Sequence, residues 1–273
     1  MSEVKKNILI GSILGDGNLA LYGRSINAYY REHGCKEQSG YRQWKAKQLN
    51  YNFIDKRNAL RSKSLVELTT LHKLFYINGK KTITKENIEL LNHPIGLMCL
   101  YFDDGSLVIQ NNNNKNSIYL FPRIYLYTQS FSKEENIILK NHLKDTFDVD
   151  FKLKWTPNGS HWHLSMNKRN YIKKFIDLIK PYAVNIECMH YKVNLEKRLK
   201  DEKNRQKKLK DKPIIIGDLS VKPNTYSKGD EALIIKMLND GITQIEIAKV
   251  LNHTYYGIVD KIRRMKKEGK IPS

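Results

Sequence analysis

The chain has 273 residues, 40% of them hydrophobic, which is enough to bury a core in one large domain or two modest domains. Its 48 Lys and Arg against 28 Asp and Glu give a formal net charge of +20, which favours nucleic acid over an anionic membrane as partner. The sequence lacks a membrane-length apolar run, a signal-peptide pattern and a Cys-x-x-Cys pair. We therefore expect a cytoplasmic or organelle-matrix protein that is not secreted and has no disulfide framework.

The first predicted element is a short apolar helix over 8–14, which leads to Asp16 followed by a glycine. Extended segments come next, at 18–31. A helix from about 41 to 53 and a strand at 64–70 complete this part of the chain.

The same scheme returns 88 positions later, where an apolar helix over 94–104 ends at Asp104, again before a glycine. Under this offset Gly11 matches Cys99, so a small residue recurs at the same place on each helix. Small residues let two helix backbones approach closely. If the helices pack about a pseudo-twofold axis, Asp16 and Asp104 emerge together at their C-terminal ends.

The elements after the second helix repeat those after the first. A strand-rich segment covers 117–128, a helix covers 132–144 after a capping box, and a hairpin covers 151–166 around a Pro-Asn-Gly turn. Each part reads as helix, strands, helix, strands, helix. We therefore predict an α+β fold with two pseudo-symmetric halves, 1–92 and 93–196.

The composition changes after the second half. Residues 197–212 hold nine basic and three acidic side chains, which indicates a linker or an exposed helix, and we assign 197–226 as a basic linker. Residues 227–273 follow with capping signals for three short helices and a tight turn before the last. This pattern predicts a helix-turn-helix DNA-binding domain, and the alternative is a helical tail with a solvated basic face.

Asp16 and Asp104 are the candidate chemical groups. A carboxylate at the negative end of a helix dipole is unfavourable unless a cation is present. Two close carboxylates with backbone carbonyls and phosphate suit Mg²⁺, which takes only one or two protein carboxylates. An Asp-Gly pair can also simply end a helix with a turn, but two copies at matching positions favour the metal site.

The two segments 9–17 and 97–105 resemble the motif of the LAGLIDADG homing endonucleases, in the single-chain form with two motif copies. Leu14 and Phe102 replace the motif's first Asp, Cys99 replaces its Gly, and the last Asp is kept in both copies. The resemblance covers about residues 7–195 and does not include the predicted helix-turn-helix.

This resemblance implies a monomeric saddle of two αββαββα halves, with sheets in the DNA major groove and carboxylates at the minor groove. It implies Mg²⁺ as cofactor, and it adds Gly15 and Asp103 to the predicted metal site. It also makes Lys81 and Lys192 the basic residue of each active site. Lys80 is an alternative to its neighbour, and Lys192 could also be one more charge on a helix.

Other basic and aromatic residues are candidate DNA contacts. In the predicted hairpin, apolar residues alternate with polar ones, so one face can pack on helices and the other can meet DNA. Two histidines without a third ligand do not predict zinc. The candidates are Arg24, Arg31, Arg123, Tyr125, Lys152, Lys154, His161 and His163 on the halves, and Lys261, Arg263 and Arg264 on the tail.

These features predict a site-specific, Mg²⁺-dependent endonuclease that cuts both strands of DNA with a long specific site. The alternative is a non-cleaving nucleic-acid binder of the same fold, either an intron RNA maturase or a transcription regulator. Intron RNA is a second candidate partner. The presence of both aspartates and both lysines favours the enzyme, since a binder gains nothing from placing two carboxylates against phosphates.

Overall fold

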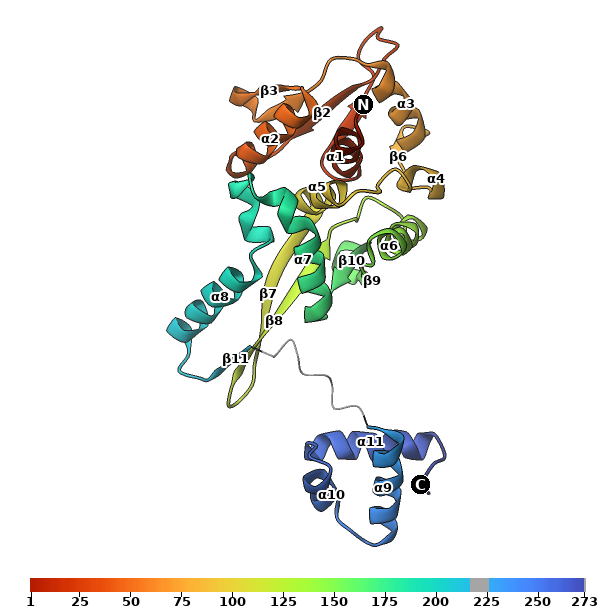
Figure 1. The fold of residues 1–273 in the computed structure, drawn as a ribbon, viewed down its shortest axis with the longest axis vertical. Coiled ribbons are helices and arrows are strands. Elements are labelled where there is room, and N and C mark those ends of the chain that lie inside the picture. Colours follow the sequence, from red (N-terminus) through yellow and green to blue (C-terminus); the bar gives the residue numbers. More distant parts are fainter. Residues whose placement is uncertain (217–225, 273) are drawn as a thin grey trace. The chain divides into compact units, whose positions relative to one another are not determined.

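The structure is a computed structural model that describes residues 1–216 and 226–272. The chain divides into two units, residues 1–217 and 218–273, which are described separately (Figure 1). In the described part of the chain, no helix combines the length and the apolar character that a membrane span requires.

The first half of the larger unit begins with helix α1 and carries a four-stranded antiparallel sheet in the order β1-β2-β4-β3. Its elements are α1 (Glu3–Leu14), β1 (Asn18–Ala20), β2 (Tyr29–His33), α2 (Ser39–Leu49), β3 (Asn52–Ile54), β4 (Ala59–Arg61), α3 (Val66–Phe75), β5 (Tyr76–Ile77), β6 (Lys80–Lys81) and α4 (Lys85–Ile88).

The second half repeats this arrangement, because its four antiparallel strands have the equivalent order β7-β8-β10-β9. Its elements are α5 (Pro94–Asp104), β7 (Gly105–Asn113), β8 (Ile118–Leu126), α6 (Lys133–Phe147), β9 (Lys152–Thr156), β10 (His161–Met166) and α7 (Arg169–Ala183). The predicted α+β fold of two similar halves is confirmed.

The strand predicted at 64–70 is wrong, because this segment enters helix α3. Adjacent threonines in the segment favour a strand, but the side chains that are buried are Leu68, Leu71 and Phe75, which is helical spacing. The helix predicted to reach residue 53 also ends earlier. Asn50 takes a left-handed conformation with a φ of 59°, and the chain continues into β3.

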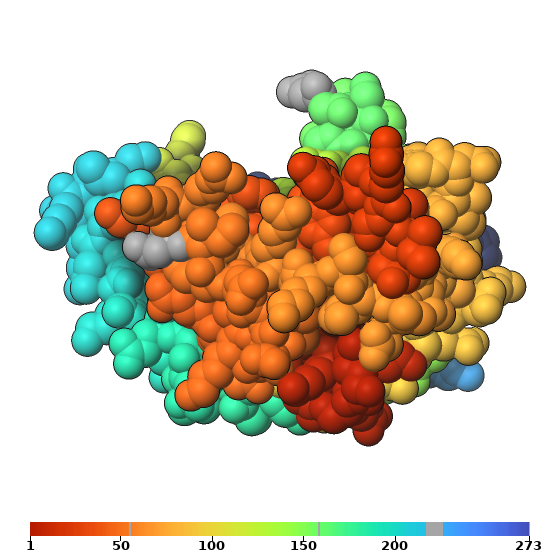
Figure 2. Space-filling model, turned by 90° about the horizontal axis from the view of Figure 1, so that it is seen from above, coloured from red at the N-terminus to blue at the C-terminus, as the bar shows by residue number. Residues whose placement is uncertain are grey.

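Residues 217–225 of the basic linker predicted at 197–226 lie outside the described residues. Residues 195–216 are not a linker, and they include the exposed helix that was the alternative for 197–212. They form helix α8 (Leu195–Leu209) and strand β11 (Ile214–Ile216), which runs parallel to β8. Leu199 packs in a small cluster with the strand residues Ile109, Ile118 and Leu120. The partly buried Leu195, Ile214 and Ile216 pack against the same cluster, so a few apolar side chains dock a helix that is otherwise highly charged. The cyan surface in Figure 2 belongs to helix α8.

The smaller unit contains the three predicted helices, α9 (Lys228–Asn239), α10 (Gln244–Val250) and α11 (Tyr255–Lys267). Ser227 caps α9 as expected, there as part of a capping box, and the expected capping box at Thr243 is present. A separate core forms between the helices from Ile234, Ile247, Ala248, Ile258, Ile262, Met265 and Ile271. The unit therefore has its own buried cluster and caps.

Helices α1 and α5 pack against each other along one side of each (Figure 1). A Cβ atom on Gly11 would lie 2.0 Å from the carbonyl oxygen of Gly96 and 3.1 Å from the Cβ of Cys99. Because a backbone carbonyl cannot move aside as a flexible side chain can, this contact requires glycine. Gly11, noted in the sequence, therefore touches the backbone of Gly96, and Cys99, the small residue matched to it, lies beside this contact.

We expect Gly11→Ala to lower the free energy of unfolding of the larger unit by about 1–3 kcal/mol or more, because the added methyl overlaps the α5 backbone. Thermal or urea unfolding measures this effect. Gly229→Ala on α9 is the control, because its Cβ would have only one neighbour, the Ser227 hydroxyl at 3.5 Å. Equal stability of the Gly11 variant and the wild type would show that the helix contact is looser than described.

Candidate active site

The two predicted aspartates lie together where α1 and α5 end. Asp104 is the last residue of α5, and Asp16 follows the C-cap of α1, Gly15. Burial, followed by the negative charge of Asp16, raises the pKa of Asp104 to about 7. Burial also raises the pKa of Asp16, while the charge of Lys45 opposes this shift. The site therefore holds two carboxylates whose negative charge is incompletely neutralised.

A lysine caps the end of each of these helices. The Nζ of Lys81 donates to the carbonyl oxygens of Gly15 and Gly17, both at 2.9 Å. The Nζ of Lys192 donates to the carbonyl oxygen of Phe102 on α5. Both lysines occupy the negative end of a helix dipole, where a cation is favourable. Burial lowers the pKa of each lysine, and the nearby aspartates oppose that shift.

The structure separates Lys81 from the alternative, Lys80. The β5–β6 hairpin turns at Asn78 and Gly79, whose φ values of 52° and 74° are those that a tight hairpin turn requires. Successive strand residues point to opposite faces. Lys81 therefore reaches the helix end while Lys80 is exposed.

Lys192 does not lie on a solvated helix face. Its residue is 5% exposed, and its backbone carbonyl accepts a hydrogen bond of 2.8 Å from the Tyr101 hydroxyl. Lys192 ends the short 3₁₀ helix at 187–192. Both its side chain and its backbone carbonyl are therefore hydrogen-bonded to residues of α5.

Gly15 and Asp103, the other predicted metal residues, already have partners. The carbonyl of Gly15 accepts from Lys81, as described above. The carboxylate of Asp103 is buried and accepts from Lys45 Nζ at 2.8 and 3.0 Å. Within Asp103, this ion pair occupies the carboxylate and does not involve the backbone carbonyl. Lys45 itself comes from α2, and sequence analysis missed it because a lysine on a charged helix carries no signal of burial.

The donor set fits a hard divalent cation with few protein ligands. Asp16 and Asp104 provide carboxylate oxygens, and the C-terminal ends of two helices surround them with carbonyls. Within residues 1–216 and 226–272, no group of three or more His, Cys, Asp or Glu side chains is arranged to hold a metal. A site with two carboxylates leaves room for water and phosphate oxygens, which Mg²⁺ prefers to keep.

A polar row crosses each sheet one residue beyond the Asp-Gly pair. In the first half, strand register aligns Asn18, Arg31, Arg61 and Asn52. The equivalent row in the second half is Ser106, Tyr125, Ser165 and Lys152. Arg61 lies over the rings of Tyr29 and Tyr22, at 4.6 and 5.7 Å, and was missed because β4 is only three residues long.

The remaining candidates on the halves lie on the same strands or beside them. Lys154 pairs with His163 and Thr156 with His161 across the β9–β10 hairpin, so the predicted polar face exists. Arg123 is half-buried on β8, next to that face. Arg24 lies in the exposed loop between β1 and β2. None of these is in the carboxylate site itself.

The basic residues predicted on the tail differ in availability. Lys261 is only 12% exposed and pairs with Glu231, so it is engaged within the unit. Arg263 pairs with Asp260 at 3.0 Å but remains largely exposed. Arg264 is exposed as well. The two arginines are therefore the available basic groups among these three.

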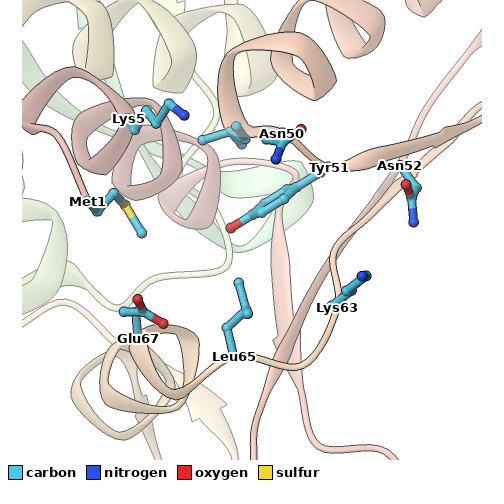
Figure 3. Close-up of a pocket in the computed structure, with 9 residues that line it drawn as sticks. Met1, Lys5, Asn50, Tyr51, Asn52, Lys63, Leu65 and Glu67 are labelled. Carbon is cyan, nitrogen blue, oxygen red and sulfur yellow. The ribbon is translucent and has the colours of Figure 1, made fainter.

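A cavity of about 380 Å³ lies at the other end of α1 (Figure 3). Its lining includes Lys5, Tyr51, Lys63 and Glu67. Lys5 lies in the first turn of α1, and the rise of the helix from there to its last residue, Leu14, is roughly 14 Å. The cavity is thus separate from the carboxylate site.

Comparison with known proteins relates the larger unit to DNA endonucleases. Residues 6–175 match the model of the LAGLIDADG DNA endonuclease family. The structure of the homing endonuclease I-WcaI bound to its DNA recognition sequence is similar, with a TM-score of 0.57 and 22% identity over 70% of this chain and 86% of that chain. The meganuclease I-SmaMI bound to uncleavable DNA has a TM-score of 0.50 and 11% identity, over 75% and 90% of the two chains.

Curated sequence relatives carry a different name. Protein RecA of Mycobacterium shimoidei is 27% identical over 203 residues, 71% of this chain and 47% of that protein. Protein RecA of Mycolicibacterium flavescens is 26% identical over 205 residues, with the same shares. The chain thus spans about half the length of the curated relatives it matches.

The raised pKa of Asp104 gives a direct test of the carboxylate pair. In metal-free protein we expect a pKa near 7 for Asp104 by NMR titration, and Asp16→Asn should lower it because the neighbouring charge is removed. A carboxyl group whose pKa is raised by folding lowers the free energy of unfolding as the pH rises from about 4 to 7. Asp104→Asn should therefore stabilise the metal-free protein more at pH 8 than at pH 5.

Glu3→Gln is the matched control for this titration, since Glu3 lies in the first turn of α1, at the opposite end from Asp16. An Asp104 pKa near 4, or one that Asp16→Asn leaves unchanged, would contradict the pairing.

Proposed function

Because the chain belongs to the LAGLIDADG DNA endonuclease family, we propose that it is a site-specific homing endonuclease that cuts both strands of DNA by Mg²⁺-dependent hydrolysis. The observation that carries this proposal is the meeting of Asp16 and Asp104 at the shared ends of α1 and α5, with one helix end capped by the half-buried Lys81 and the other by the buried Lys192.

Asp16 and Asp104 would hold the metal through their carboxylates. A divalent cation bound there supplies an activated water and neutralises the leaving oxygen of the phosphodiester. In the metal-free chain, Lys81 and Lys192 hold the helix ends in place through backbone carbonyls. Ammonium groups at these helix ends would suit stabilisation of phosphorane charge on a phosphate held at the two carboxylates.

The polar rows across the two sheets support recognition of a long site. Each row begins beside a catalytic aspartate, and both grooves of DNA offer hydrogen-bonding edges to such side chains. The rows differ, since Arg31 and Arg61 of the first are matched by Tyr125 and Ser165 in the second. Asn52 of the first row is matched by Lys152. One chain with unlike halves would read a target whose two half-sites differ in sequence, without forming a dimer.

A non-cleaving binder of intron RNA or of regulatory DNA is the second candidate. The same basic surfaces would serve it, so the fold does not decide between the two. The carboxylate pair does favour the enzyme, because two carboxylates repel phosphate and are useful only with a cation between them. Maturase activity on intron RNA can coexist with cleavage.

We further propose that the smaller unit, residues 226–272, adds DNA contacts as a helix-turn-helix. The turn before α11 contains Asn252 with a φ of 51°, and α11 presents exposed Arg263 and Arg264. The last helix of such a motif can lie in the major groove. The alternative, a helical tail with a solvated basic face, predicts no effect on DNA binding.

The first test replaces each aspartate by its neutral isostere. Asp16→Asn or Asp104→Asn should abolish double-strand cleavage, because the metal loses a carboxylate ligand, while DNA affinity stays equal or rises as repulsion of phosphate is relieved. Target selection from a randomised duplex library in Mg²⁺ supplies the substrate, and Asp177→Asn on the exposed face of α7 is the control. Wild-type cutting by either single variant would refute the paired site.

The second test removes the smaller unit. Truncation after Gly217 keeps β11 and its cluster, so the larger unit should fold and cut but bind more weakly. The salt slope of log K should shrink by about 0.9 for each lost phosphate contact. The protected DNA should shorten on one side only. Arg263→Gln with Arg264→Gln should reproduce part of the loss, whereas an unchanged slope and footprint would remove the unit from DNA binding.

A further inference from the structure

Three charged side chains are completely buried beneath the aspartate pair. Lys45, Glu32 and Asp103 each have no exposed side-chain surface. The Nζ of Lys45 lies 2.8 Å from Glu32 Oε2 and 2.8 Å from Asp103 Oδ1. Tyr30 donates its hydroxyl to Glu32, and the Lys45 ammonium also lies 4.3 Å from the centre of the Tyr41 ring. Buried charges of this kind are costly unless paired.

This network joins the two halves. Glu32 lies on β2 and Lys45 on α2, both in the first half, while Asp103 lies on α5 in the second. Asp103 Oδ2 also accepts a long hydrogen bond of 3.4 Å from the backbone N–H of Asp16. The carboxylate of Asp103 therefore contacts both Lys45 on α2 and the backbone of Asp16, one of the two aspartates proposed to bind the metal.

The network is also asymmetric, and this asymmetry fits a role in setting the distance between the ends of α1 and α5. Gly15 and Asp103 occupy equivalent positions before the two aspartates, and a Cβ on Gly15 would lie 2.5 Å from the Cβ of Asp103. Because Gly15 has no side chain, the end of α1 leaves a gap, and the Asp103 side chain at the end of α5 fills it. Without a partner for that carboxylate, Asp103 could not remain in the gap, because an unpaired buried charge is strongly unfavourable.

We propose that Lys45 is a positioning residue for the aspartate pair. By holding Asp103 in the gap at Gly15, it fixes how the ends of α1 and α5 lie against each other and so sets the separation of the Asp16 and Asp104 carboxylates. Glu32 balances the charge of Lys45. This inference rests on the proposed function, since it gives the spacing a purpose in metal binding.

The test compares Lys45→Met, Asp103→Asn, Glu32→Gln and the exposed control Lys47→Met. Single-turnover cleavage at saturating DNA and Mg²⁺ separates the rate constant from the amplitude. A loss of folded protein lowers only the amplitude. Lys45→Met and Asp103→Asn should lower the rate constant at least tenfold with DNA affinity within about threefold. If Lys45→Met fails to fold, Asp103→Asn decides, because it keeps the Lys45–Glu32 pair.

Glu32→Gln is the control matched for stability, because it disturbs the same buried network but retains the contact of Lys45 with Asp103. Its rate constant should stay within about threefold of the wild type, as should that of Lys47→Met. Equal slowing by Glu32→Gln and Lys45→Met would overturn the proposal, and so would unchanged rate constants in folded Lys45→Met or Asp103→Asn.

Binding of Mn²⁺ to the DNA complex, followed by electron paramagnetic resonance, is a readout that does not need cleavage. Lys45→Met should weaken Mn²⁺ binding at least fivefold and Lys47→Met should not change it. If the wild type binds Mn²⁺ at the pair but does not cut, the proposed nuclease function fails while these affinities still decide the role of Lys45. Equal Mn²⁺ affinity in all variants would refute the positioning role.

Discussion

The backbone contact between α1 and α5 is the constraint on which the rest of the molecule depends. Gly11 approaches the carbonyl of Gly96 so closely that a single methyl group would not fit. Helices that touch at this distance over their length also end together, and their last residues then share one small volume. Two aspartates 88 positions apart in the chain, Asp16 and Asp104, become neighbours for this reason.

The C-terminal ends of α1 and α5 are the negative ends of two helix dipoles, and they meet at Asp16 and Asp104. Negative charge is therefore concentrated at this point. Three lysines, two of them buried and one half-buried, offset it in different ways. Lys81 and Lys192 bind helix-end carbonyls, and Lys45 pairs with Asp103. Burial, followed by the charge of Asp16, nevertheless raises the pKa of Asp104 to about 7 in the metal-free chain. Under the proposed function, a divalent cation between the two carboxylates would neutralise their charge further.

Local sequence signals predicted the repeated helix ends, the polar face of the second hairpin and the caps of the tail, because each depends on neighbouring residues. The family that the two Asp-Gly motifs resemble is also confirmed. Local sequence signals failed where contacts between residues far apart in the chain determine the structure. The helix α3 replaced a predicted strand, and α8 docked through Leu199 onto strands about 90 residues away. The ion pair of Lys45 with Asp103 joins separate halves, so no local pattern in either segment could reveal it.

The central claim is that a divalent metal binds between Asp16 and Asp104 when DNA is present. A crystal structure of the protein with its selected target and Mn²⁺, with the metal located by anomalous scattering, tests this most directly. We predict metal density in contact with both carboxylates and with phosphate oxygens at the centre of the site. Well-ordered DNA with no metal at either carboxylate, or phosphates remote from both, would contradict the account.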